Sequence, residues 1–110
     1  MPDVRTDARL EPLQFSSVAE FYPFYLSQHR SYVNRRLHFI GTTGLLVALM
    51  AALISHEGRW LVAVPLSGYG FAWIGHFVFE KNRPATFRYP LYSFVCDFLM
   101  YRDMLLQRPL

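Results

Sequence analysis

The sequence predicts an all-helical membrane protein, and three observations carry that prediction. Residues 37–55 and 60–79 contain no Asp, Glu, Lys or Arg. As helices of about 30 Å, both segments match the hydrocarbon thickness of a bilayer. The chain is 53% hydrophobic and only 17% charged, which is more apolar than a typical soluble domain. Two buried core helices are the alternative, but 110 residues leave too little protein to cover both of them.

The two apolar segments are predicted to form a transmembrane helical hairpin. The four residues between them, "HEGR" at 56–59, allow only a tight antiparallel connection. Basic residues gather at the other end of the hairpin, which indicates that both chain termini are cytoplasmic. Three of these basic residues precede the first segment and three follow the second, namely Arg30, Arg35, Arg36, Lys81, Arg83 and Arg88.

Flanking helices are predicted over residues 17–33 and 90–106, and we expect both to lie along the membrane interface. Ser17 and Glu20 have the spacing of a capping box, although Pro23 also suits the first turn of a helix. Pro90 suits the first turn of the last helix. Residues 1–14 are predicted to be flexible, and residues 15–110 to form a single helical domain.

The charge pattern predicts a lipid partner rather than nucleic acid. The net charge is +3, but the basic residues sit beside apolar runs and form no stripe. Cys96 is the single cysteine, so the chain can form no internal disulfide and no cysteine-rich zinc site. A homo-oligomer is compatible with the sequence, which leaves the number of copies open.

Three of the four histidines are predicted to lie near one another. His38 and His76 are each 19 positions from Glu57 at the centre of the loop, so an antiparallel hairpin places them at one depth. His29 can join them if the chain turns near Asn34, since nine residues of straight helix would point His29 and His38 to opposite faces. His56 lies about 27 Å away, at the opposite end of the hairpin.

A cluster of imidazoles with a carboxylate suits iron, zinc or manganese. A ligand set that leaves coordination positions of the metal open suits non-haem Fe(II) and oxygen chemistry. Each histidine alone is also explained as a polar anchor at the membrane surface. Glu80 shares a helical face with His76, but an ion pair with Lys81 or Arg83 explains it as well. Asp97 has three possible interpretations: a metal ligand, an acid farther from the metal, or simply the polar residue of the last helix.

Two blocks of the sequence resemble a known family. They are "FYPFYLSQHRSYVNRRLHFIGT" at 21–42 and "AWIGHFVFEKNRPATFRYPLYSFVCDFLM" at 72–100. The chain is similar to the short bacterial branch of the family named for the metabolism of phytosphingosine to odd-numbered fatty acids. Members of the longer, eukaryotic branch carry a glycine-containing turn like "EGRAPA" where this chain has "EKNRPA".

The resemblance implies an Fe(II)-dependent dioxygenase that removes one carbon from 2-hydroxy fatty acids, with molecular oxygen as co-substrate, in the bacterial inner membrane. His29, His38 and His76 match the family's histidines and are the implied metal ligands and catalytic residues, with Glu80 or Asp97 as a further ligand. Arg35, Arg36 and Arg83 are candidate partners of the substrate carboxylate, and Asn34 is a candidate supporting residue. The alternative is a small membrane scaffold or lipid-binding protein with a structural metal site or none.

Overall fold

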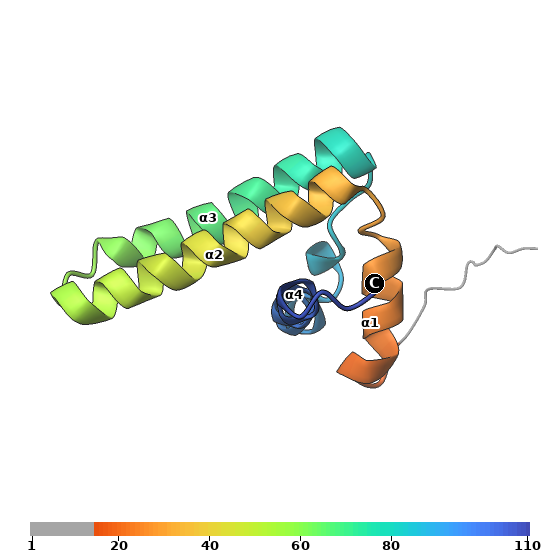
Figure 1. Ribbon diagram of the computed structural model, residues 1–110, viewed down its shortest axis with the longest axis horizontal. Coiled ribbons are helices and arrows are strands. Elements are labelled where there is room, and N and C mark those ends of the chain that lie inside the picture. Colours follow the sequence, from red (N-terminus) through yellow and green to blue (C-terminus); the bar gives the residue numbers. More distant parts are fainter. Residues whose placement is uncertain (1–14) are drawn as a thin grey trace, which may run out of the picture.

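The computed structural model describes residues 15–110, which fold into helices and contain no strand (Figure 1). The expected flexibility of residues 1–14 lies outside this range. The predicted all-helical fold with two apolar segments of membrane-spanning length is confirmed. In chain order the elements are α1 (Val18–Ser27), α2 (Tyr32–Ser55), α3 (Trp60–Ile74), the single π-helical turn η1 (Gly75–Glu80), the 3₁₀ turn η2 (Ala85–Phe87) and α4 (Pro90–Leu105).

Helix α1 begins where the capping residues predict. The Ser17 side chain accepts a hydrogen bond from the Glu20 amide at 3.1 Å, which satisfies one of the unpaired donors of the first turn. The Glu20 carboxylate accepts from both the amide and the hydroxyl of Ser16, rather than from the amide of Ser17. Pro23 lies inside the helix and not in its first turn.

The turn between α1 and α2 lies earlier than the sequence suggested. Helix α1 ends at Ser27, and α2 begins at Tyr32. The first flanking helix, predicted at about 17–33, therefore ends at Ser27, and the helix that carries the first apolar segment begins five residues before residue 37. Ser31 is the reason, because its hydroxyl accepts from the Asn34 amide and starts a new helix there. The turn near Asn34 is in fact formed by residues 28–31.

Helices α2 and α3 form the predicted hairpin and approach each other closely in its middle. The Ser67 hydroxyl donates to the Gly41 carbonyl at 2.9 Å. A β-carbon at position 41 would come 2.7 Å from the Ser67 carbonyl oxygen, so only glycine permits this approach. The second predicted span, 60–79, matches a continuous helical run from Trp60 to Glu80, although its last turn is π-helical.

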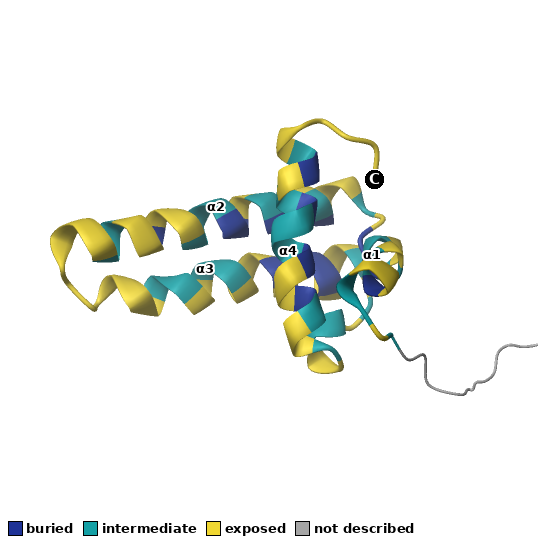
Figure 2. Cartoon of the chain, turned by 90° about the horizontal axis from the view of Figure 1, so that it is seen from below, coloured by how far each residue is buried: buried dark blue, intermediate teal, exposed yellow. Residues whose placement is uncertain are grey.

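Helices α1 and α4 pack together at one end of the hairpin and form what we call the head, together with η2 (Figures 1 and 2). Helix α4 crosses the hairpin rather than running along it. Its observed bounds, Pro90–Leu105, agree with the predicted 90–106 within one residue. The head has its own buried core of four side chains, namely Phe21, Tyr25, Cys96 and Met100.

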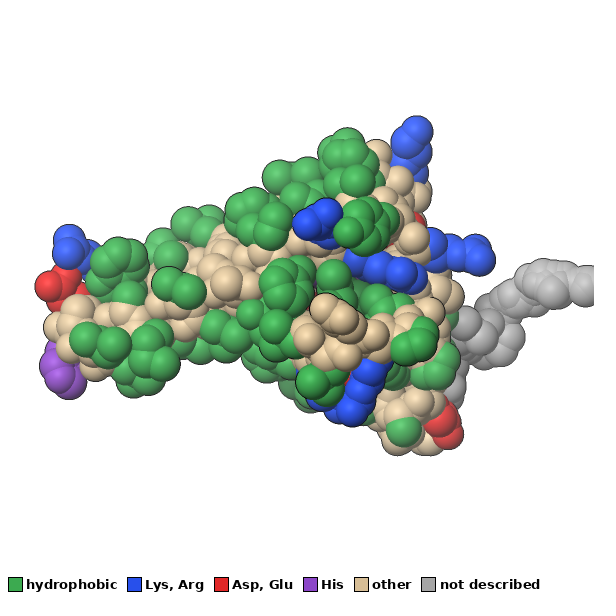
Figure 3. Space-filling model, in the orientation of Figure 1, with side chains coloured by type: hydrophobic (Ala, Val, Ile, Leu, Met, Phe, Trp, Pro, Cys, Tyr) green, Lys and Arg blue, Asp and Glu red, His purple; other side chains and the backbone are tan. Residues whose placement is uncertain are grey.

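The rest of the hairpin, residues 46–66, projects from the head, and we call it the arm. Large apolar side chains cover it, among them Leu53, Ile54 and Leu66, each about 70% exposed. Figure 3 shows the charged groups of this region confined to its tip. Both Tyr32–Ser55 and Trp60–Glu80 are long and apolar enough to cross a membrane. An exposed apolar surface of this size is typical of contact with lipid.

Candidate metal centre

Three buried histidines meet where the hairpin enters the head. His38 lies on α2, His76 lies in η1, and His29 follows α1. The Nε2 atom of His29 lies 3.1 Å from Nε2 of His38 and 3.0 Å from Nε2 of His76. The rings of His38 and His76 are 5.0 Å apart, as expected for residues level with each other in the hairpin. His56, at the tip of the arm, is exposed. We call the three buried residues the histidine triad.

Each ring of the triad is held by a hydrogen bond from its other nitrogen. Nδ1 of His29 lies 2.6 Å from the Tyr25 carbonyl, and Nδ1 of His38 lies 3.0 Å from the Asn34 carbonyl. Nδ1 of His76 lies 2.7 Å from Oδ1 of Asn82. Carbonyl oxygens only accept hydrogen bonds, so all three Nδ1 atoms carry the proton. Second-shell acceptors of this kind set ring orientation in metal sites.

The Asn82 amide is itself oriented. Its Nδ2 group donates to the Gln28 carbonyl at 3.1 Å, which turns its oxygen toward His76. The same side chain therefore ties the segment after η1 to the end of α1. The orientation of His76 thus rests on a second hydrogen bond at the head.

With every Nδ1 protonated, the three Nε2 atoms present lone pairs to one another. Neutral nitrogen acceptors about 3 Å apart repel unless a cation lies between them. A proton shared between these nitrogens is disfavoured, because the pKa of His29 is held well below its usual value. Burial is the larger cause of this shift, and the nearby imidazoles of His38 and His76 add to it. The arrangement therefore favours a bound metal ion.

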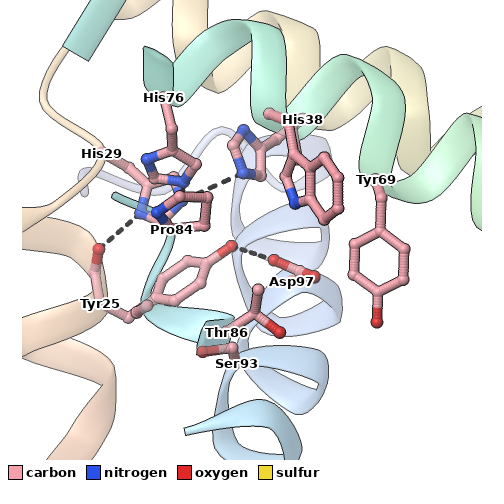
Figure 4. A pocket seen from close by; sticks show the side chains of 12 residues that line it. Tyr25, His29, His38, Tyr69, His76, Pro84, Thr86, Ser93 and Asp97 are labelled. Carbon is pink, nitrogen blue, oxygen red and sulfur yellow. Dashed lines mark hydrogen bonds between the residues drawn. The ribbon is translucent and has the colours of Figure 1, made fainter. Parts of the chain in front are cut away.

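The distances fit such an ion. Two nitrogens that bind one metal at about 2.1 Å lie about 3.0 Å apart at a right angle and about 3.4 Å apart at the tetrahedral angle. The two short Nε2 separations agree with the first value. A cavity of about 20 Å³ beside the triad has room for one small ligand (Figure 4). Thus the triad could hold one metal ion and leave a position open.

Asp97 faces the same cavity but lies outside the group of nitrogen atoms that could share an ion. Its Oδ1 accepts a hydrogen bond from the Tyr25 hydroxyl. The Tyr25 ring in turn stacks on the His29 ring, with 4.0 Å between the ring centres. Burial raises the pKa of Asp97 to about 6, and the Tyr25 hydrogen bond opposes this shift. Asp97 therefore supports His29 through Tyr25.

Glu80 also lies outside the triad, and it joins the ends of α2 and η1. Its carboxylate accepts from the Ser31 amide and from the Asn34 side-chain amide. Asn34 is fully buried, and its Oδ1 has no hydrogen-bond partner within the described residues. That atom packs against Gly75, where an added β-carbon would come within 1.8 Å of it. Gly75 therefore allows η1 to lie close enough to α2 for His76 to reach His38.

The three arginines predicted to contact substrate occupy different surroundings. The Arg35 Nε group donates to the His29 carbonyl and helps to hold the turn before α2. Arg36 donates to the Tyr32 hydroxyl at 3.1 Å on the exposed face of α2. Arg83 lies over the Phe87 ring and lines a cleft of about 420 Å³. Pro84 and Ala85 separate this cleft from the triad cavity, because they line both.

Sequence reasoning missed Tyr25, Gly75 and Asn82 as parts of the site. An amide six residues after a candidate ligand, in a basic turn closed by Pro84, was the available signal for Asn82. A glycine directly before His76 was the signal for Gly75, but the sequence offered membrane helix packing as an equally good reason. Tyr25 gave no signal, since it fits the apolar face of α1.

A family model described as 2-hydroxy-palmitic acid dioxygenase Mpo1-like matches residues 15–109, nearly the whole chain. The match includes all three histidines of the triad. No curated protein and no solved structure gave a significant match.

Proposed function

The chain belongs to the Mpo1-like family, and we propose that it is an Fe(II)-dependent dioxygenase of 2-hydroxy fatty acids. The reaction removes one carbon: RCH(OH)COOH and O2 give RCOOH, CO2 and water. C1 and C2 of the substrate together lose four electrons, and these reduce dioxygen. The family description supports the substrate class, and the histidine triad supports the metal.

The observation that carries the proposal is the convergence of three Nε2 lone pairs with all three Nδ1 protons committed to carbonyl oxygens. Such a set has no role in a passive membrane anchor, because a polar anchor needs contact with water or headgroups. All three triad residues are at most 6% exposed. Three neutral nitrogen ligands that leave coordination positions open suit a metal ion that also binds substrate.

When bound, Fe(II) supplies the redox chemistry that zinc lacks and that dioxygen activation requires. The chain's own residues then have four tasks. His29, His38 and His76 hold the ion, and the Tyr25, Asn34 and Asn82 oxygens keep each ring in its binding tautomer. Asp97 faces the cavity and would accept a proton from the substrate's 2-hydroxyl group. Pro84 and Trp73, which line the cavity, limit the access of water.

Arg83 is the arginine best placed to meet the substrate carboxylate. Pro84 and Ala85 form a shared wall between its cleft and the triad cavity, and Arg88 lines the same cleft. Arg35 is committed to the His29 carbonyl, so we assign it a positioning role. Asn34 has a positioning role as well, since its carbonyl accepts from His38.

The membrane setting follows from the two apolar helices. With the arm in the bilayer, the basic residues around the triad support a cytoplasmic position for that end, at the surface of a bacterial inner membrane. Helices α1 and α4 cross the hairpin direction, an orientation that supports a position along that surface. A lipid acid there keeps its carboxylate near the triad while its tail stays in the apolar layer.

The test is metal content and substrate conversion on one preparation. We expect protein purified without oxygen to hold one iron ion per chain and to convert 2-hydroxypalmitate to pentadecanoic acid under oxygen. His38→Ala and His76→Ala should lose both the iron and the conversion.

Absence of iron from the purified protein, together with unchanged stability and unchanged conversion of 2-hydroxypalmitate in the two variants, would contradict the proposal. Stoichiometric zinc without conversion would instead favour the non-enzymatic alternative, in which the triad holds a structural metal ion.

A further inference from the structure

An apolar groove of about 210 Å³ runs from the triad toward the arm, between α2, α3 and α4. His38, Tyr69 and Asp97 line both this groove and the triad cavity. The groove therefore begins where the candidate metal centre ends. Its remaining lining residues are mostly apolar, namely Thr42, Leu45, Val64, Pro65, Gly68, Phe94 and Phe98.

Two helical stripes form the long walls of the groove. On α2, Thr42 and Leu45 follow His38 at spacings of four and three residues, so they continue the face that carries the ligand. On α3, Pro65 and Gly68 line the groove, and Ala72, which lines the triad cavity, continues the same kind of spacing toward His76. On each of the two helices, the candidate metal ligand therefore lies on the same face as the residues that form the groove wall.

Helix α4 closes the third side. Phe94 and Phe98 pack edge to face, with 5.2 Å between their ring centres. A hydrogen bond of 2.9 Å between the hydroxyl groups of Thr43 and Tyr101 holds α4 to α2. Phe94 is half exposed, so the groove has a rim open to the surroundings of the hairpin.

We propose that this groove holds the acyl chain of the substrate and that Gly68 sets the room available to it. The proposal rests on the proposed function and names the part of the site that selects the substrate. A 2-hydroxy fatty acid has polar groups at one end and a long apolar tail. The groove has the matching arrangement, with His38 and Asp97 at one end and apolar walls beyond them.

The position of the groove favours a lipid tail over a soluble apolar ligand. Its far residues, Leu45 and Val64, belong to helices whose outer faces are apolar and exposed. A tail can therefore enter from the side, within the apolar layer, without crossing water. The head of the same molecule then reaches the triad at the end of the groove.

Gly68 is the residue that a substitution can use to fill the groove. It lines the groove, and a β-carbon there would come 3.0 Å from Cδ1 of Leu45. Gly70, two residues along the same helix, is a matched control. A β-carbon at position 70 would meet nothing within 4 Å.

The first test measures conversion of a series of 2-hydroxy acids from octanoate to octadecanoate. Gly68→Leu should shift the preference toward shorter acids and lower kcat/KM for the longest by about tenfold or more, as expected when an apolar pocket loses room for methylene groups. Phe98→Ala enlarges the groove and should shift the preference toward longer acids. Gly70→Leu should leave the preference unchanged. Equal effects at positions 68 and 70 would overturn the proposal.

The second test does not depend on turnover. A 2-hydroxy acid with a photoreactive group on its tail is added to the whole protein in lipid nanodiscs and then illuminated. We expect labels on peptides that contain Leu45, Phe94 or Phe98, and excess unlabelled 2-hydroxypalmitate should remove them. Labels on the arm near Ile54 should persist, because that surface meets bulk lipid. If competition removes neither group of labels, the proposal is wrong.

The two tests separate this inference from the proposed function. Competed labelling of the groove without any conversion would support the acyl site and contradict the dioxygenase. Conversion with no competed label and no change in chain preference would support the dioxygenase and overturn the acyl site.

Discussion

The two ends of the hairpin carry histidines in opposite situations. At the tip, His56 ends α2 with a left-handed backbone (φ 57°) and an exposed side chain. At the head, His38 and His76 are buried and their Nδ1 atoms are bonded to oxygens of Asn34 and Asn82. Both ends combine histidine with charged residues in the sequence, so composition alone does not separate them.

The difference teaches that a candidate metal centre depends on supporting structure as well as on ligand types. The head supplies α1 and α4, which bury the triad and add Tyr25 and Asp97 behind His29. The tip has a pair between Glu57 and Arg59, but both side chains are largely exposed. An exposed pair of this kind contributes little to stability and orients nothing further.

The largest difference between the two ends is expected when one histidine is removed from each. We expect His29→Ala to lower conversion by more than about a hundredfold, because losing a ligand costs more than the 10–100-fold typical of a supporting residue. His56→Ala should leave conversion and metal content unchanged. Equal losses at the two ends would show that the histidines do not act as a local cluster.

Gly75→Ala tests how closely the two spans must pack at the head. The added β-carbon meets the buried Asn34 side chain at 1.8 Å, so we expect overpacking to cost about 1–3 kcal/mol and to displace His76. Gly70→Ala adds the same atom where nothing lies within 4 Å, and it should not destabilise the protein. Thermal unfolding of both variants in detergent checks the difference. A destabilised Gly70→Ala variant would point to a general requirement for glycine in α3.

Asn82 tests whether the hydrogen bond to His76 matters for metal binding. Asn82→Leu removes the acceptor and should weaken metal affinity by about 10–100-fold. Asn82→Asp keeps an oxygen acceptor for His76 but loses the donor to the Gln28 carbonyl, so it should retain more of the affinity than Asn82→Leu and less than the wild type. Metal titration of the apo-protein measures both. If leucine and aspartate behave alike, the side chain acts only on packing.

Asp97 gives an expected effect that is confined to one pH range, a change in how stability depends on pH. Its pKa is raised from 3.8 to about 6 on folding, so between these values the folded state binds more protons than the unfolded state. Stability therefore falls as pH rises from about 4 to about 6, by roughly 3 kcal/mol, and then levels. Asp97→Asn should flatten this slope in thermal unfolding of the metal-free protein.

Much of the fold was predictable because the apolar core of a bilayer restricts the length and composition of the helices that can cross it. Two charge-free segments and a four-residue connection define the hairpin, and equal distances from Glu57 place His38 and His76 together. The start of α2 was missed because Ser31 gives a weak capping signal beside the apolar run that dominates the pattern. The role of Glu80 depends on its contacts with Ser31 and Asn34, which are 49 and 46 residues away, so no local pattern could reveal it.

The site was less predictable than the fold, since its supporting atoms are partly backbone. The carbonyl groups of Tyr25 and Asn34 fix two of the three rings, and every residue has a carbonyl group. Only the three-dimensional path of the chain decides which of them is available. The ligand candidates were visible in the sequence because histidine is rare within apolar segments.

X-ray absorption at the iron edge of protein loaded with Fe(II) without oxygen tests the central claim most directly. The account predicts three imidazole nitrogens at about 2.1 Å in the wild type and in His56→Ala. It predicts two, or loss of the iron, in His38→Ala. An iron ion with no imidazole ligand, or one whose surroundings are unchanged in His38→Ala, would contradict it.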